Sequence, residues 1–319
     1  MFPINWNFDT EFDEFSSKTS ATRLVYQLCD NQSTLQTALT SLRSASSLIM
    51  DCEARNLGNQ GGVLSIISLR STTSTDIFLI DVVRLNGSLS PLFHLLESTE
   101  VVKIMFDGRM DFSALYHEFG IHLKNVLDLQ LADIYSRRVR RETDARRISR
   151  LQPYLPACKI ASAPGLYTRA IKLGGLSQCV REHLGRSESK QPVNHDNWLK
   201  RPLSQAYLSY AATDIHLMAL LYDKFVAKGY INTMELGEQS TRYVELWKKS
   251  QPVCEDYYKR HPLLPVEILV PPSDGIKKTC RGCEREVIQA SMSADGSLCH
   301  ICKIVAGKNS HMVSPRRRY

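Results

Sequence analysis

Five side chains of this 319-residue chain could together perform metal-dependent chemistry. They are four carboxylates and one tyrosine, each at the end of an apolar run or inside an amphipathic one: Asp51, Glu53, Asp111, Tyr210 and Asp214. An isolated acid is costly to bury unless it is paired or bound to a metal ion. Two divalent metal ions are therefore the best explanation for acids in such a setting, and the question becomes which elements position them.

Asp51 and Glu53 directly follow the apolar run 47–50, which is typical of the end of a buried strand. Residues two apart in a strand share a face, so both carboxylates point one way and Cys52 the other. Adjacent carboxylates repel and raise one another's pKa. Mg²⁺ or Mn²⁺, which prefer oxygen ligands, would remove that repulsion. A solvated D-x-E at a strand end is also common, so this pair alone leaves both interpretations open.

The segments that follow predict an α/β domain. Residues 61–70 and 76–83 are β-branched runs separated by Ser/Thr-rich turn residues, as in neighbouring antiparallel strands. A short helix over 90–98 and a strand over 101–106 come next. Asp111 lies just after that strand, in the first turn of a helix whose apolar face is Phe112, Leu115, Tyr116 and Phe119. It could be a metal ligand or only the N-cap of that helix.

Residues 197–225 predict a loop followed by one long helix, with Pro202 near the helix start. Tyr210 and Asp214 are four residues apart and therefore share a helical face. The same face carries Tyr207, Leu217 and Leu221, which indicates that it looks inward. A Tyr–Asp hydrogen bond inside the core is the structural alternative to a functional pair.

Taken in order, these segments resemble the DEDDy branch of the DnaQ-like 3′–5′ exonucleases, which includes ribonuclease D, the Werner exonuclease domain and the egalitarian-like proteins. The family's D-x-E, its Asp at a helix start and its Y-x-x-x-D match the five residues above. WLKRPLSQAYLSYAATD, VLDLQLADIYS and GGLSQCVREHLG also resemble ribonuclease D segments, and the likeness spans about residues 22–228. It implies a ribonuclease H-like mixed sheet flanked by helices.

The resemblance also implies a two-metal mechanism with two Mg²⁺ or Mn²⁺ ions. Asp51 would bridge the ions, Glu53 and Asp214 would complete the site for the ion that carries the attacking water, and Asp111 would hold the second ion directly or through water. Tyr210 would orient the water beside the scissile phosphate. Such ions activate water and stabilise the leaving oxygen. The implied substrate is single-stranded nucleic acid with a free 3′ end, RNA rather than DNA.

Some features depart from ribonuclease D. Asp107, four residues before Asp111, is an extra acid that we interpret as a turn residue, and we see no helical nucleic-acid-binding domain after the catalytic one. An Arg-rich insertion covers about 137–165, and its second half, 153–165, is expected to be irregular and mobile. It could be a solvated charged face or could contact substrate phosphates. The candidate phosphate contacts are Arg137, Arg138, Arg140 and Arg141.

Two C-x₂-C pairs near the C-terminus predict a Cys₄ zinc ribbon-like module over 276–306. The four candidate ligands of one structural Zn²⁺ are Cys280, Cys283, Cys299 and Cys302, with a D-G turn before the second pair. His300 is a weaker candidate ligand. So small a module cannot fold on its own core, so the metal would stabilise it. Two redox-active pairs or an unstructured tail are the alternatives, and the module could contact nucleic acid, dock a protein partner or act as a lid.

The expected organisation is a flexible segment 1–21, an exonuclease domain 22–232, a helical then Pro-rich linker 233–275, the zinc module 276–306 and a basic tail 307–319. No apolar run approaches the ~20 residues that span a bilayer, so no membrane partner is expected. Five further cysteines show no disulfide framework, which indicates an intracellular compartment, cytoplasmic or nuclear. The net charge of +7 suits a polyanionic substrate.

Two functions of different classes follow. The first is an active metal-dependent 3′–5′ exonuclease. The alternative is a catalytically weak or inactive RNA-binding or scaffold protein on the same fold, acting in an RNA-processing or silencing complex; an interaction protein with a decayed domain is a variant of it. Retaining all four acids and the tyrosine favours the enzyme, because an inactive protein has no need to keep facing carboxylates.

Overall fold

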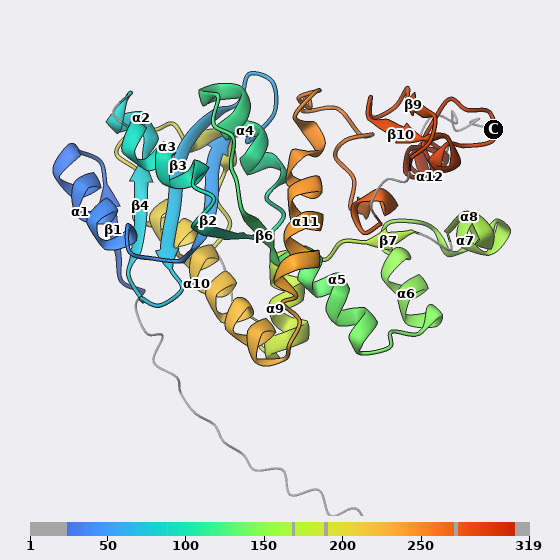
Figure 1. Cartoon of the computed structure of the whole chain (residues 1–319), viewed down its shortest axis with the longest axis horizontal. Coiled ribbons are helices and arrows are strands. Elements are labelled where there is room, and N and C mark those ends of the chain that lie inside the picture. Colours follow the sequence, from blue (N-terminus) through green and yellow to red (C-terminus); the bar gives the residue numbers. More distant parts are fainter. Residues whose placement is uncertain (1–23, 88, 168–169, 188–190, 271–273, 310–319) are drawn as a thin grey trace, which may run out of the picture.

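The computed structural model describes residues 24–87, 89–167, 170–187, 191–270 and 274–309. A six-stranded mixed sheet forms its centre, in the order β1-β4-β3-β2-β5-β6 (Figure 1). The antiparallel pairs are β2 with β3 and β3 with β4, and the other neighbours are parallel. The strands are Tyr26–Cys29, Ser47–Arg55, Val63–Ser71, Ile77–Asp81, Val102–Met105 and Val126–Asp128. The predicted mixed sheet of an α/β domain is thereby confirmed.

Helices cover both faces of this sheet. On one face, α1 (Gln32–Leu42), α3 (Ser90–Glu97) and α4 (Arg109–Phe119) enclose a core with β2 and β3. On the other, α5 (Leu129–Val139), α9 (Leu176–Leu184), α10 (Gln205–Ala227) and α11 (Thr233–Val244) enclose a second core. A short helix, α2 (Val82–Leu85), follows β4 directly.

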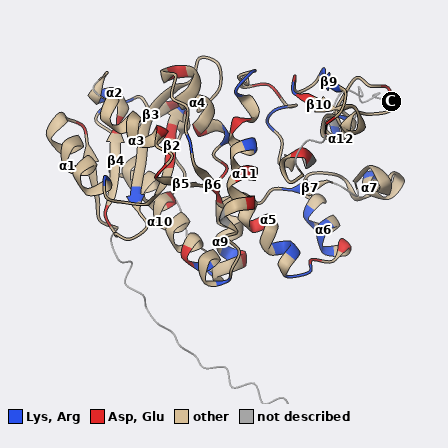
Figure 2. Cartoon of the chain, viewed as in Figure 1, with Lys and Arg blue, Asp and Glu red and all other residues tan. Residues whose placement is uncertain are grey.

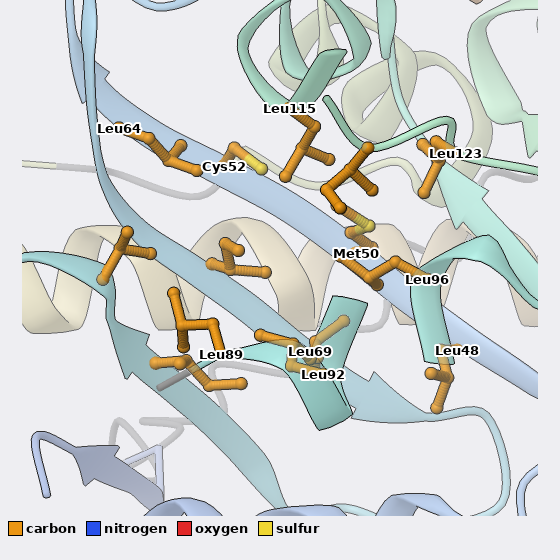
Figure 3. Close-up of a cluster of buried hydrophobic side chains, with 14 of the residues drawn as sticks. Leu48, Met50, Cys52, Leu64, Leu69, Leu89, Leu92, Leu96, Leu115 and Leu123 are labelled. Atoms are coloured by element: carbon orange, nitrogen blue, oxygen red, sulfur yellow. The ribbon is translucent and has the colours of Figure 1, made fainter. Parts of the chain in front are cut away.

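Strand β2 alternates between these two cores. Leu48, Met50 and Cys52 point into the first core, beside Leu115 of α4 (Figure 3). Residues one position away point to the opposite face, where Ile49 joins the second core. Asp51 and Glu53 continue this second row, as the two-residue period predicts. The register of β2 against β3 shifts between Glu53 and Ala54, an irregularity that is common beside functional sites.

Most of the expected elements are present where the sequence indicated them, with displaced ends. The strand predicted at 76–83 stops at Asp81, because its side chain accepts a hydrogen bond from the backbone N–H of Arg84 and caps α2. The helix expected to begin near Pro202 begins at Gln205, after Ser204. Strands β1 and β6 at the two edges of the sheet were not predicted.

The segment expected to be a helical and Pro-rich linker contributes to the main core. Tyr243 of α11 is fully buried, and the hydroxyl of Ser240 accepts a hydrogen bond from the backbone N–H of Asp128 at 2.8 Å. Farther along, β8 (Leu263–Leu264) pairs with β7 (Ile171–Lys172). Helix α11 lies against β6 and α4, and the domain boundary at residue 232 stays a prediction.

The Arg-rich insertion and the cysteine module share a third core. The insertion forms α6 (Asp144–Leu151), α7 (Ala157–Ser162) and α8 (Pro164–Tyr167), so the irregular structure expected for 153–165 is wrong. The module consists of β9 (Lys277–Thr279), β10 (Glu286–Ile288) and α12 (His300–Asn309). The shared core includes Leu151, Leu155 and Ile160 from the insertion, Trp247 and Leu263 from the intervening segment, and Val287, Ile301 and Val305 from the module.

Two expectations concern residues outside the described ranges: the N-terminal segment 1–21 and, apart from 307–309 in α12, the basic tail. Among the helices that the structure does describe, none is long and apolar enough to cross a membrane.

Candidate active site

Three of the predicted acids converge between β2 and α10. Asp51, Glu53 and Asp214 each offer a carboxylate oxygen, and these oxygens all lie within 4.8 Å of one another. Glu53 is buried, with 6% of its surface exposed, whereas Asp51 and Asp214 are half-buried. The strand period places the first two acids on the face that α10 covers, and the helix then supplies the third. Three carboxylates so close together are unfavourable without a compensating cation.

Asp111 lies beside this cluster but is not one of the three acids in it. It is in the first turn of α4, and its Oδ1 accepts a hydrogen bond from the backbone N–H of Cys52 at 2.8 Å. Cys52 lies between Asp51 and Glu53 in β2. The N-cap alternative is wrong, because Gly108 occupies the N-cap. Burial raises the pKa of Asp111 to about 7, despite the lowering effect of that hydrogen bond.

The start of α4 is held by a second acid. Asp128, at the N-cap of α5, accepts hydrogen bonds from the backbone N–H groups of Gly108 at 2.9 Å and Gln130 at 2.8 Å. Asp107 has a left-handed backbone with φ of 58° and forms a two-fold ion pair with Arg109 at 2.6 and 2.8 Å. This conformation is consistent with the turn role that we inferred for Asp107.

Tyr210 packs into an aromatic group at the edge of the acid cluster. Its ring lies 5.8 Å from that of His195 and 6.2 Å from that of Trp198, between centroids. Burial, followed by the charges of Asp214, Glu53 and Asp51, raises the pKa of Tyr210 well above its ordinary value. The phenol therefore stays protonated at neutral pH and can donate a hydrogen bond, but it cannot act as a base.

Arg201 anchors the loop that carries this aromatic group. Its guanidinium forms a two-fold ion pair with the buried Asp81, at 2.7 Å for each bond, and donates to the carbonyl of Trp198 at 2.7 Å. The hydroxyl of Ser65 donates to the same carbonyl at 2.6 Å. The peptide bond before Pro202 is cis. The hydrogen bonds of Arg201 and Ser65 thus hold Trp198 in place. We call Tyr210, His195 and Trp198 the aromatic wall of the site.

His195 is a site residue that our sequence analysis missed. Its Nδ1 lies 4.0 Å from Oε2 of Glu53 and accepts a hydrogen bond from the indole N–H of Trp198 at 3.2 Å. More than half of its side chain is exposed, so it faces the open side of the cluster. The available signal was its place three residues before Trp198, just ahead of the segment that resembles ribonuclease D.

Comparison with known proteins decides the family. The family model for a 3′–5′ exonuclease matches residues 26–229, which contain all five predicted site residues. The chain belongs to this 3′–5′ exonuclease family. The match ends within the loop before α11, so the insertion lies inside the exonuclease domain and the cysteine module lies beyond it.

The curated relatives of this chain are distant in sequence. Protein RRP6-like 1 of Arabidopsis thaliana is 20% identical over 74% of this chain and 31% of its own length. The piRNA biogenesis protein EXD1 of Mus musculus is 24% identical over 77% of this chain and 40% of its own length. The chain thus spans less than half the length of these relatives.

Solved structures support the fold. The ribonuclease D of Trypanosoma brucei aligns with a TM-score of 0.60 at 20% identity, over 86% of each chain. The same protein in complex with the RNA U12 aligns with a TM-score of 0.58 at 22% identity, over 82% of this chain and 83% of that one.

The acid cluster of the exonuclease domain fits divalent ions. Asp51, Glu53 and Asp214 supply only oxygen donors, which suit Mg²⁺ or Mn²⁺. A second cluster, Asp133, Glu182 and His183, does not fit a metal equally well. Its carboxylates are already neutralised by the arginines that pair with them: Arg137, Arg140 and Arg150.

The four predicted phosphate contacts of the exonuclease have different environments. Arg137 is buried, pairs with Asp133 at 2.5 Å and donates to the carbonyl of Lys172, and phosphate contact by Arg137 stays a prediction. Arg140 pairs with Glu182 at 2.9 Å and is half-exposed. For Arg140, as for Arg138 and Arg141, phosphate contact stays a prediction. Several Lys and Arg positions lie along α6 and the end of α5 (Figure 2).

The four predicted zinc ligands converge in the C-terminal module. Cys280, Cys283, Cys299 and Cys302 are all buried, and their sulfur atoms lie within 4.8 Å of one another. The predicted D-G turn is present, with Gly296 at φ of 67°. His300 is not in this cluster. Four thiols at this spacing fit a tetrahedral Zn²⁺. None of the nine cysteines forms a disulfide, so these four are available as ligands.

Proposed function

We propose that this protein is an active, metal-dependent 3′–5′ exonuclease that hydrolyses phosphodiester bonds of single-stranded RNA. The observation that carries the proposal is the convergence of three carboxylates from β2 and α10, on the family's fold. An inactive scaffold would gain nothing from three facing acids, which repel one another unless a cation neutralises them.

Each acid has a distinct task in this proposal. Asp51, Glu53 and Asp214 would hold the divalent ions, with Asp51 shared between two of them, and Asp111 would act from the adjacent backbone, directly or through water. Such ions, when bound, lower the pKa of water and neutralise charge that develops on the phosphate. The Cys52 N–H bond fixes the Asp111 carboxylate next to the β2 acids before any metal binds.

The aromatic wall would orient the reacting groups. The phenolic O–H of Tyr210 donates a hydrogen bond to the attacking water or to a phosphate oxygen, because its raised pKa keeps the hydroxyl protonated. His195 and Trp198 support the ring from the loop that Arg201 anchors. The exposed His195 would contact the nucleotide at the 3′ end.

The preference for RNA is supported by the relatives, several of which are named for RNA processes: piRNA biogenesis and the exosome complex. The solved neighbour that is bound to an RNA has the same fold. One structural Zn²⁺ in the Cys₄ cluster, and a protein partner docked through that module, complete the proposal. The nine free cysteines suit an intracellular, reducing compartment, in the cytoplasm or the nucleus.

The test is digestion of a 5′-labelled single-stranded RNA and of the matching DNA with Mg²⁺ or Mn²⁺. We expect a ladder that shortens by one nucleotide at a time, faster on RNA, and we expect no internal cuts. An RNA whose 3′ hydroxyl is blocked serves as the control for direction and should be degraded more slowly. Binding of both substrates without any cleavage would contradict the enzyme and favour a scaffold.

A further inference from the structure

A cationic cavity lies apart from the acid cluster, among α5, α6, β7 and α11. Its volume is about 460 Å³, and none of its lining residues belongs to the acid cluster or its aromatic wall. Six cationic side chains line it: Arg137, Arg138, Arg141, Arg147, Arg150 and Lys172. Only two carboxylates, Glu142 and Glu235, face them in the lining. Apolar side chains such as Ile134, Ile171 and Leu269 form the remaining wall.

The carboxylates leave part of this positive charge unpaired. Within the lining, Glu142 pairs with Arg150 at 2.6 Å, and Glu235 accepts a hydrogen bond from Gln239 at 3.1 Å. Outside the lining, Asp133 pairs with Arg137, Asp144 with Arg147 and Glu182 with Arg150. Arg138 and Arg141 form no ion pair with any carboxylate among the described residues; Arg138 instead lies over the ring of Tyr135, 5.4 Å from its centroid.

Two further features indicate that the cavity favours an anion. The side chain of Arg137 is only 6% exposed, yet its Nε has no hydrogen-bond partner in the described part of the chain. Lys172 lines the cavity together with Arg137 and Arg150, and burial, followed by the charges of these two guanidiniums, lowers the pKa of Lys172. An anion in the cavity would offset the repulsion between these groups.

We propose that this cavity binds a nucleoside monophosphate. The phosphate would lie against Arg138, Arg141 and Lys172, since guanidinium and ammonium groups are suited to phosphate oxygens. The base would pack on the apolar wall beside Ile171 and Leu269. The volume is in the range of pockets that enclose small ligands, and it is bounded on several sides, which suits one nucleotide better than a continuous strand. In this proposal, the cationic side chains of the cavity bind a mononucleotide and not the RNA substrate that is bound at the acid cluster.

The test is calorimetric titration of the full chain carrying Asp51→Asn, without added Mg²⁺ or Mn²⁺, so that no catalysis occurs. Uridine monophosphate and adenosine monophosphate are the ligands, with uridine and inorganic phosphate as probes of each half. We expect both monophosphates to bind, and uridine and phosphate to bind at least about tenfold more weakly. Loss of one charged hydrogen bond, by Lys172→Met or Arg138→Gln, should weaken binding about tenfold or more.

Arg146→Gln is the matched control, because Arg146 is on α6, is 63% exposed and does not line the cavity. It should leave the affinity unchanged. If Lys172→Met fails to fold by thermal unfolding, Arg138→Gln carries the test alone, since Arg138 has no ion pair to lose. Absence of monophosphate binding at millimolar concentration, or equal affinity in all variants, would overturn the proposal. Binding of a short RNA oligomer alone, lost in the same variants, would also overturn it and assign the cavity to a strand. None of these outcomes depends on whether the acid cluster is catalytically active, because the titration measures binding in the Asp51→Asn chain.

Discussion

At the scale of single residues, Tyr210 has a different role from the acids of the proposed metal centre. Its ring packs against His195, and burial, followed by the charges of Asp214, Glu53 and Asp51, raises the pKa of its hydroxyl. A group with that environment can orient water or phosphate but contributes little to binding of divalent ions. The acids and the tyrosine should therefore respond differently to substitution.

The variant Tyr210→Phe tests this difference. Removing only the hydroxyl keeps the ring packing, so Mn²⁺ affinity by calorimetry should be unchanged. The rate of RNA cleavage should fall by about 10- to 100-fold, on the order of 1.4–2.7 kcal/mol of barrier. An unchanged rate would show that the hydroxyl takes no part, and loss of Mn²⁺ binding would show that its role is structural.

Sequence periodicity was sufficient for the residues within single elements. The two-residue period of β2 paired Asp51 with Glu53, and the helical period of α10 paired Tyr210 with Asp214. The hydrogen bond from Cys52 to Asp111 and the approach of His195 to Glu53 join segments 59 and 142 positions apart, so no local pattern contained them. The ion pair of Arg137 with Asp133 lies within α5, one turn apart, but its second partner, the carbonyl of Lys172, belongs to β7, 35 positions later, so no local pattern contained the burial of Arg137.

At the scale of elements, the loop before α10 depends on one buried ion pair. Arg201 connects this loop to Asp81 at the end of β4, and the same carboxylate caps α2. The position of the aromatic wall is thus coupled to the sheet. The sequence suggested the segment only through its likeness to ribonuclease D, because the partner Asp81 lies 120 residues earlier.

Arg201→Lys should weaken that coupling while preserving the charge. A lysine cannot form the two-fold pair, so we expect the free energy of unfolding to fall by about 1–3 kcal/mol and cleavage to slow. Chemical denaturation and the RNA assay measure the two effects. Lys200→Arg, at the neighbouring exposed position, is the control; a similar loss in both variants would contradict a specific role for the pair.

His261 makes the segment between α11 and the module sensitive to acid. It is buried, and its Nδ1 accepts a hydrogen bond from the backbone N–H of Leu263. Burial lowers its pKa from 6.5 to about 3, so only the unfolded chain takes up a proton between these values. The stabilisation is complete above pH 6.5 and is lost as the pH falls below it, by about 1.4 kcal/mol per pH unit.

The variant His261→Gln isolates this effect from the acid sensitivity of the thiolates. Between about pH 7 and pH 5, the wild-type free energy of unfolding should fall by roughly 2 kcal/mol more than that of the variant. Urea denaturation at both pH values measures the difference. Parallel losses in the two proteins would show that His261 does not titrate in this way.

At the scale of the whole molecule, the Cys₄ module and the Arg-rich insertion form one unit. They share a core that contains the four cysteines, and ion pairs join the module to the preceding segment, including Lys259–Glu284 and Arg285–Glu267. The sequence analysis separated these parts, because they are more than 100 residues apart and only folding brings them together. The exonuclease sheet has its own two cores.

Removal of zinc should therefore affect the insertion as well as the module. After treatment with a thiol-selective chelator, amide hydrogen exchange should speed up in 276–309 and in α6–α8. The strands β2 to β5 should stay protected, since their cores are separate. Re-addition of Zn²⁺ should restore protection. Unchanged exchange in α6–α8 after loss of the metal would contradict the shared unit.

The most direct test of the central claim compares wild type with Asp51→Asn on a 5′-labelled single-stranded RNA in Mn²⁺. The account predicts stepwise shortening from the 3′ end by the wild type and a rate at least about 10³-fold lower for the variant, on the order of 4 kcal/mol. Asp30→Asn, at an exposed site next to α1, should retain the wild-type rate. Equal cleavage by wild type and Asp51→Asn, or no cleavage by either, would contradict a metal centre built on Asp51, Glu53 and Asp214.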